Sequence, residues 1–201
     1  AFTGFKGSGK TTAAQHLMNS RKIAHKFKPI NFKDPFIEML RTLGLTDDEI
    51  DGPMKELPSD TLCGATPRHA MQTLGVEWGR NLIHDDIWVQ TWQRRVAEAS
   101  IAGLNIVTDD CRFRDEAQQI NIFGGHVIKI QRVMDMNTSH MISLRKPELC
   151  PECHASETEM KSITPTVTIV NDGSVRELKD QLDAVMDQLV LSPQEVANVR
   201  P

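Results

Sequence analysis

The eight residues from Gly4 to Thr11 constrain this chain more than any other segment. They read Gly-Phe-Lys-Gly-Ser-Gly-Lys-Thr and match the pattern G-x-x-x-x-G-K-[ST] in full. Glycines let a loop turn its backbone N–H groups inward around an anion, and a helix that follows directs its N-terminal donors to the same place. The flanking residues predict a strand up to Thr3 and an apolar-faced helix after the loop. We therefore expect a phosphate-binding loop between a strand and a helix.

Each residue type in this loop suits a chemical role. Lys10 would place a point charge on the β- and γ-phosphates of a nucleoside triphosphate, and the Thr11 hydroxyl can ligate Mg²⁺. The alternative is a chance glycine-rich turn, which the expected strand and helix around it disfavour. We expect ATP and Mg²⁺ as ligands, and the residues predicted to hold ATP in this loop are Gly7, Ser8, Gly9, Lys10, Thr11 and Thr12.

The rest of the chain alternates short apolar strands with amphipathic helices. Further strands are expected at 27–32, 104–109, 126–131 and 166–170, and helices at 34–41, 66–83, 86–102, 114–123 and 174–191. This order predicts an α/β fold in three layers, a P-loop NTPase fold with a mostly parallel central sheet of about five strands. The 201 residues suffice for one substantial domain, so we expect a single domain over 1–201.

Composition excludes several classes of protein. A net charge of −4 and a pI of about 6.0 argue against a broad nucleic-acid-binding surface. No apolar run approaches the ~18 residues of a membrane span, and no secretory signal is visible. The four cysteines are expected to be cytosolic thiols rather than a disulfide framework. We therefore expect a cytoplasmic protein without a nucleic-acid or membrane partner, with a homodimer left open, and a few residues before Ala1, which falls inside an expected strand.

Two acidic residues follow the strand expected at 104–109. The carboxyl ends of parallel strands form the ligand crevice in this class of fold, and a carboxylate there commonly holds Mg²⁺. We therefore predict Thr11, Asp109 and Asp110 as Mg²⁺ ligands, although Asp110 could instead cap the helix at 114–123. Arg112 would face the same crevice and suits a phosphate group, the alternative being a surface arginine.

Several segments, in order along the chain, resemble phage and bacterial deoxynucleoside monophosphate kinases. Residues 110–117 resemble the D-x-R-F-x-x-E-A signature of that family, and residues 68–75 resemble its R-x-x-[LM]-Q-x-[LM]-G segment. Residues 86–89, 154–157 and 171–174 resemble its W-V step, its H-x-[ST]-E motif and its N-D-G-[ST] turn. Together with the 4–11 loop, the matches run in order from residue 2 to about residue 190.

The resemblance implies transfer of the ATP γ-phosphoryl group to a deoxynucleoside monophosphate (dNMP), which gives a diphosphate. It also implies an acceptor-binding helical region over about 33–102 and a lid over about 133–163. Arg68 would bind the acceptor phosphate, Gly75 and Trp88 would line the base and sugar site, and Arg112 would assist at the transferred group. Gln72 and Asp34 are further acceptor candidates, and Asn171 is an ATP candidate. Trp88 as a core residue and Gln72 as a helix-surface residue are the alternatives.

One position departs from the family pattern. Many relatives place a lysine near the acceptor, two residues after the proline of an Asp-Pro turn, where this chain has Ile37. Lys33, just before the turn, is the candidate replacement. Arg80 lies about three turns beyond Arg68 on one expected helix, and we expect it to form a surface ion pair rather than to reach the crevice.

The segment from 133 to 163 shows no clear periodicity and is interpreted as the lid. Arg132 and Arg145 are candidates for the arginine that neutralises charge on the transferring group, and Arg132 is preferred because it leaves a core strand at its carboxyl end. The predicted catalytic residues are therefore Lys10, Arg112, Arg132 and Arg145.

The segment Cys150-Pro-Glu-Cys-His154 matches C-x-x-C-H, and two free thiols are expected there. The alternatives are a zinc site that adds His154 and His140 to the two cysteines, a redox pair, or haem attachment. For the whole chain, the alternatives to a dNMP kinase are another P-loop kinase, such as a dephospho-CoA kinase, and a non-kinase ATPase module. The short, acidic chain with its lid-like segment favours the dNMP kinase.

Overall fold

The computed structural model describes residues 1–20, 27–132 and 159–191. The strands in this part of the chain are β1 (Phe2–Thr3), β2 (Phe27–Pro29), β3 (Asn105–Val107), β4 (Ile128–Gln131) and β5 (Val167–Val170). All of their pairings are parallel, with Phe2 opposite Ile128, Ile128 opposite Val167, and Phe27 opposite Asn105. Parallel pairing fits the predicted alternation of strands and helices.

The prediction of one sheet with about five strands is wrong, because the five strands are divided between two sheets. The strands form a three-stranded sheet in the order β1-β4-β5 and a separate two-stranded sheet of β2 and β3. The two sheets still meet, because the Phe2 N–H donates to the Thr108 carbonyl just after β3, at 2.7 Å. β1 has two residues and already pairs with β4. It therefore offers few backbone groups for a regular pairing with β3 along its other edge.

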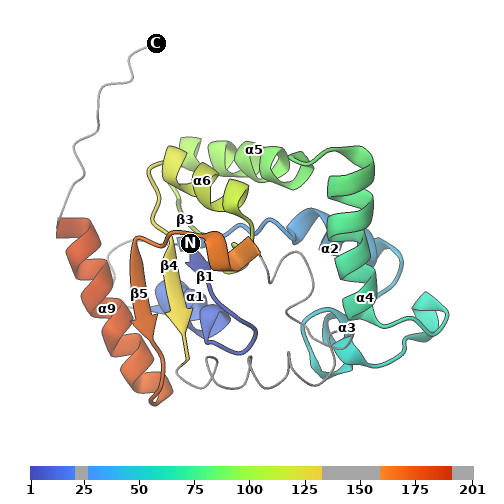
Figure 1. Ribbon diagram of the computed structural model, residues 1–201, viewed down its shortest axis with the longest axis horizontal. Helices are drawn as coiled ribbons and strands as arrows, with labels where there is room; N and C mark the ends of the chain where they lie inside the picture. Colours follow the sequence, from blue (N-terminus) through green and yellow to red (C-terminus); the bar gives the residue numbers. More distant parts are fainter. Residues whose placement is uncertain (21–26, 133–158, 192–201) are drawn as a thin grey trace, which may run out of the picture.

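Helices cover both faces of the strands (Figure 1). On one face, α1 (Lys10–Asn19) and α9 (Val175–Leu191) pack against β1, β4 and β5 through Ala13, Leu17, Leu178 and Leu182. On the other face, α5 (Ile87–Ile101) and α6 (Arg114–Ile122) bury a second core that includes Trp92, Val96, Ala117 and Ile120. The α/β arrangement in layers therefore agrees with the prediction. Val175, the first residue of α9, is 57% exposed and lies outside this core.

The helical region between β2 and α5 has a small core of its own. It contains α2 (Asp34–Thr42), α3 (Asp47–Ile50) and α4 (Pro67–Gln72), which lie to the right of the strands in Figure 1. Its core is built from Ile37, Leu40, Leu45, Ile50 and Met71. Ile37 is 4% exposed, so its side chain serves this core and not a ligand. The helical region therefore forms a packed unit beside the strands.

Two local features differ from the expected pattern in this region. The expected helix 66–83 does run unbroken, but its second part, η3 (Thr73–Ile83), is wound as a π-helix. Residues 52–65, for which no helix or strand was expected, contain two short 3₁₀ turns, η1 (Pro53–Glu56) and η2 (Asp60–Leu62). Thr46 and Glu49 form a capping box at the start of α3.

The predicted lid, with Arg145 and the segment 150–154, lies outside the described residues except at its end. There a 3₁₀ turn, η6 (Met160–Ser162), places Met160 and Ile163 in the core with α5 and α6. Of the described cysteines, Cys63 is exposed and Cys111 is buried, and both carry free thiols. Within the described ranges, no helix combines the length and apolar character needed to cross a membrane.

Candidate active site

The loop from Gly4 to Gly9 joins β1 to α1 and depends on its glycines. Gly4, Gly7 and Gly9 have φ angles of +142°, +79° and +110°, a region that side-chain-bearing residues rarely adopt. A Cβ on Gly4 would lie 2.2 Å from the Ile130 carbonyl oxygen, and a Cβ on Gly9 would lie 2.8 Å from Asn171 Nδ2. The loop therefore needs glycine both for its conformation and for its close approach to β4 and to Asn171.

Two predicted residues fix the position of this loop. Lys10, the first residue of α1, donates hydrogen bonds from Nζ to the carbonyl oxygens of Gly4 and Phe5, at 2.7 and 2.8 Å. Asn171, which follows β5, donates from Nδ2 to the Ser8 carbonyl at 2.7 Å and is buried. Asn171 therefore anchors the loop to the end of β5, through a contact between residues 163 positions apart in the chain.

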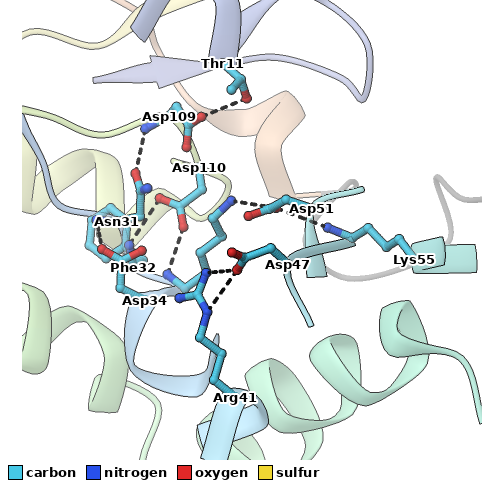
Figure 2. A network of polar contacts seen from close by, with 11 residues as sticks. Thr11, Asn31, Phe32, Asp34, Arg41, Asp47, Asp51, Lys55, Asp109 and Asp110 are labelled. Atoms are coloured by element: carbon cyan, nitrogen blue, oxygen red, sulfur yellow. Dashed lines mark hydrogen bonds and ion pairs between the residues drawn. The ribbon is translucent and has the colours of Figure 1, made fainter. Parts of the chain in front are cut away.

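Thr11 and Asp109 form the polar pair expected of a metal site. The Thr11 hydroxyl donates to Asp109 Oδ2 at 2.8 Å, as Figure 2 shows. The backbone N–H of Asp109 donates to Asn31 Oδ1 at 2.9 Å, which fixes the carboxylate at the end of β3. Asp109 Oδ1 is buried and has no hydrogen-bond partner among the described residues. A hydroxyl and a carboxylate with an oxygen to spare are ligands that suit Mg²⁺.

Asp110 faces a different neighbour. Its two carboxylate oxygens accept hydrogen bonds from the backbone N–H groups of Phe32 and Lys33, at 3.1 and 2.8 Å (Figure 2). Burial raises the pKa of Asp110 to about 6, the Asp109 charge adds to the rise, and Lys33 opposes it. Asp110 thus holds the turn before α2. It does not cap α6, because the N-cap position of that helix is Phe113 and the Asp110 oxygens are engaged by Phe32 and Lys33.

One cavity of about 520 Å³ joins the 4–11 loop to the helical region. Its polar side is lined from the loop and from the ends of the strands, and its apolar side by Phe36, Met71, Val76, Trp88 and Phe113. The residues that the sequence predicted and that line this cavity are Gly7, Lys10, Thr11, Lys33, Arg68, Gln72, Gly75, Trp88, Asp109, Asp110 and Arg112. Residues predicted for the donor, the metal and the acceptor therefore border one space.

The other described candidates lie outside this lining. Thr12 lines a separate cavity between α1 and α9. Asp34 lines a cavity beside Arg95, and its carboxylate accepts a hydrogen bond from the Asn31 N–H at 2.8 Å, so it stabilises its own turn. Arg132 is exposed and directly follows β4.

Trp88 is a fixed wall of the cavity. Its indole is 4% exposed, and Nε1 donates to the Gly75 carbonyl at 2.7 Å. The Phe36 ring meets it edge-on, with centroids 5.0 Å apart. The ring also packs on Gly79, where a Cβ would lie 2.4 Å from the indole. Trp88 is therefore both a core residue and part of the apolar lining, which joins the two interpretations that the sequence left open.

The Arg80 expectation is wrong in two respects, because its ion pair is buried and because Arg80 does reach the crevice, where it lines the cavity. Arg80 does form ion pairs, to Asp115 at 2.7 Å and to Glu116 at 3.0 Å, but its side chain is only 10% exposed. Its guanidinium also lies 3.9 Å from the centroid of the Phe113 ring. The pair is buried because α6 supplies both carboxylates against η3, a long-range contact that local sequence does not reveal.

Glu116 links this ion pair to Arg112. It bonds Arg80 through Oε1, while Oε2 accepts from the backbone N–H groups of Arg112 and Phe113 at 2.7 and 3.0 Å. Burial raises the pKa of Glu116 to about 8, against the opposing charge of Arg80. Glu116 therefore positions the backbone of Arg112. The signal in the sequence was the glutamate of the D-x-R-F-x-x-E-A match, which had no role assigned to it.

Two further lining residues escaped the sequence analysis. Glu56, in η1, pairs with Lys6 of the loop at 2.7 Å and with the Arg68 guanidinium. Lys55, its neighbour, pairs with Asp51 at 3.7 Å. Both come from a segment without periodicity, so no pattern marked them.

Comparison with known proteins identifies the class. The chain is 30% identical over 199 residues to a protein of Acanthamoeba polyphaga mimivirus named "Putative deoxynucleotide monophosphate kinase", an alignment that covers 92% of this chain and 93% of the relative. No family model matches the chain. The chain belongs to the deoxynucleotide monophosphate kinase family, and the cavity described above is its candidate active site. The narrower resemblance to phage and bacterial members stays a prediction, since this relative comes from mimivirus.

Proposed function

We propose that this protein transfers the γ-phosphoryl group of ATP to the phosphate of a deoxynucleoside monophosphate. The observation that carries the proposal is the single cavity lined both by Lys10 and Thr11 of the loop and by Arg68 of the helical region. A kinase of this kind must hold two phosphorylated molecules with their phosphates adjacent. A cavity lined by cations from both regions suits that requirement.

The donor half would be formed by the 4–11 loop and the start of α1. Backbone N–H groups of the loop and Lys10 would bind the β- and γ-phosphates. Thr11 and Asp109 would hold Mg²⁺, and Asp110, which fixes the neighbouring turn, is a further candidate. When bound, Mg²⁺ neutralises charge on the phosphates.

The acceptor half would be formed by α4, η3 and the start of α5. Arg68 would bind the acceptor phosphate, because a guanidinium can donate two parallel hydrogen bonds to phosphate oxygens. The base and sugar would pack on the wall of Phe36, Gly75 and Trp88, with Gln72 as a donor or acceptor for the base. Lys33 lines the same cavity. It is the proposed replacement for the lysine that the family pattern has at the position of Ile37.

Transfer would occur between the two halves. An oxygen of the acceptor phosphate attacks the γ-phosphorus, the bond to the bridging oxygen breaks, and ADP leaves. Arg112 would stabilise charge on the transferring group, since Glu116 holds its backbone at the cavity. Arg132 and Arg145 are further candidates for that role, and closure of a lid over 133–163 would exclude water.

A panel of ribo- and deoxynucleoside monophosphates with ATP and Mg²⁺ tests the proposal. The expected result is ADP and a nucleoside diphosphate in equal amounts with at least one dNMP, and loss of both products in Lys10→Ala. ATP hydrolysis without a phosphorylated product would favour an ATPase module. Phosphorylation of dephospho-CoA in place of every nucleotide would favour the other kinase class.

A further inference from the structure

Lys55 is a cavity-lining cation to which the sequence patterns assigned no role. It lies in η1, and its side chain is 25% exposed. A lysine with so little access to water is stabilised by an anion close by. Its carboxylate neighbour Asp51 caps the end of α3, four residues earlier in the chain. Lys55 Nζ lies 3.7 Å from Asp51 Oδ1, which is an ion pair too long for a hydrogen bond (Figure 2).

Other cations surround the same space. Lys33 approaches the same Oδ1 of Asp51 at 3.5 Å, so one exposed carboxylate faces two lysines. Arg68 and Arg112 line the cavity with them. Burial lowers the pKa of Lys55, Asp51 opposes the shift, and the neighbouring cations add to it. The positive charges of Lys55 and its neighbours repel one another. A doubly charged anion among them would offset this repulsion more than the single charge of Asp51 does.

Asp51 is a weakly held ion-pair partner of Lys33 and Lys55, which a ligand could replace. It is 58% exposed, and neither lysine is within hydrogen-bond distance of it. Pairs of this kind contribute little free energy, so either lysine can exchange Asp51 for a phosphate oxygen at small cost. The carboxylate therefore keeps the two ammonium groups at the edge of the cavity without competing strongly for them.

We infer that Lys55 is a ligand of the acceptor's phosphate group, which it binds together with Arg68. This inference rests on the proposed function, because it takes the acceptor to be a nucleoside monophosphate. The competing view is that Lys55 is only the i,i+4 partner of Asp51, with no part in binding.

Kinetics of three variants test the inference. Lys55→Met keeps the aliphatic stem and removes the charge, so we expect the KM for the best dNMP to rise about 10- to 100-fold. The KM for ATP should change less than threefold. Lys55→Arg restores the charge and should recover most of the loss. Lys28→Met is the matched control, because Lys28 is exposed on β2 and outside this cavity; its kinetics should equal those of the wild type.

Equilibrium binding separates phosphate recognition from turnover. For Lys55→Met, affinity for the dNMP should fall about as far as KM rises, while affinity for the matching deoxynucleoside, which has no phosphate, stays unchanged. A dNMP affinity within threefold of the wild type, or an equal loss for the nucleoside, would overturn the inference. If the wild type binds dNMPs but transfers no phosphate to them, the proposed function fails, and the binding comparison still decides the role of Lys55.

Discussion

The guanidinium of Arg68 donates a hydrogen bond from Nε to the carboxylate of Glu56. The same carboxylate oxygen accepts from Nζ of Lys6 in the 4–11 loop, at 2.7 Å. One carboxylate thus joins a residue of the proposed donor loop to the arginine proposed for the acceptor phosphate. A phosphate bound as proposed would need the same guanidinium, so Glu56 and the acceptor would compete for Arg68.

Glu56→Gln should therefore lower the KM for the acceptor. The pair is partly exposed, with 31% of the Arg68 side chain and 50% of the Glu56 side chain accessible, so its contribution is about 1 kcal/mol at most. The expected decrease is up to about fivefold, measured by steady-state kinetics with saturating ATP.

Glu38→Gln is the matched control, because Glu38 pairs with Arg95 outside the active-site cavity. It should leave both KM values unchanged. A higher acceptor KM in Glu56→Gln would mean that Glu56 positions Arg68 for the phosphate and does not compete with it.

The contact between Gly79 and Trp88 predicts a large effect from one methyl group. In Gly79→Ala the new Cβ would lie 2.4 Å from the indole, so the ring must move. We expect a loss of about 1–3 kcal/mol in the free energy of unfolding, measured with urea, and a higher acceptor KM.

Gly75→Ala, in the same helix, is the control for stability. Its Cβ would lie 3.5 Å from the Phe36 ring, which is an ordinary contact. Alanine also favours helix over glycine, so stability should be unchanged or slightly higher. Equal losses in the two variants would show that the indole contact is not the cause.

Glu116 should make stability depend on pH. Burial raises its pKa from 4.5 to about 8 in the folded protein, although Arg80 opposes the shift. The folded state therefore binds more protons than the unfolded state between about pH 5 and 8, and stability is lost as the pH rises through this window. The slope would reach about 1.4 kcal/mol per pH unit.

Glu116→Gln is the reference, because its neutral amide cannot titrate. The free energy of unfolding of the wild type minus that of the variant should fall as the pH rises from 5 to 8. Taking the difference removes titrations that the two proteins share. A difference that is flat with pH would show that the charge on Glu116 is the same in both states.

Local patterns predicted the parts of the site that are contiguous in sequence. The 4–11 loop follows from glycine spacing alone. The Thr11–Asp109 pair followed from one topological rule, since Asp109 ends a strand and the carboxyl ends of parallel strands gather together. The positions of the longer helices also followed from periodicity, as for the helix expected at 114–123 and found at Arg114–Ile122.

What the sequence could not predict depends on contacts between distant residues. Arg80 is buried because α6 places two carboxylates beside it, 35 and 36 residues away. Glu56 meets Arg68 because a short 3₁₀ turn carries it there, and no periodicity marks that turn. The strands are divided into two sheets because β1 is only two residues long. Residue propensities do not specify whether so short a strand pairs along both of its edges.

The spare oxygen of Asp109 predicts how ATP binding depends on magnesium. Asp109 Oδ1 is buried with no hydrogen-bond partner within the described part of the chain, and Thr11 bonds the other oxygen. In Asp109→Asn the backbone hydrogen bond to Asn31 is retained, but the negative charge is lost. We therefore expect affinity for ATP with Mg²⁺ to fall about tenfold, while affinity for ATP in the presence of EDTA stays the same or rises, because one repulsive charge has gone.

Isothermal titration of wild type and variant, with Mg²⁺ and with EDTA, measures this difference. Asp115→Asn is the control, because Asp115 pairs with Arg80 and does not contact Thr11; the ratio of its two affinities should equal that of the wild type. If Asp109→Asn weakens ATP binding equally with and without Mg²⁺, the carboxylate supports the loop and does not hold the ion. The test then passes to Asp110→Asn, whose effect on the Mg²⁺ ratio would identify Asp110 as the acidic ligand, although its oxygens accept hydrogen bonds from Phe32 and Lys33.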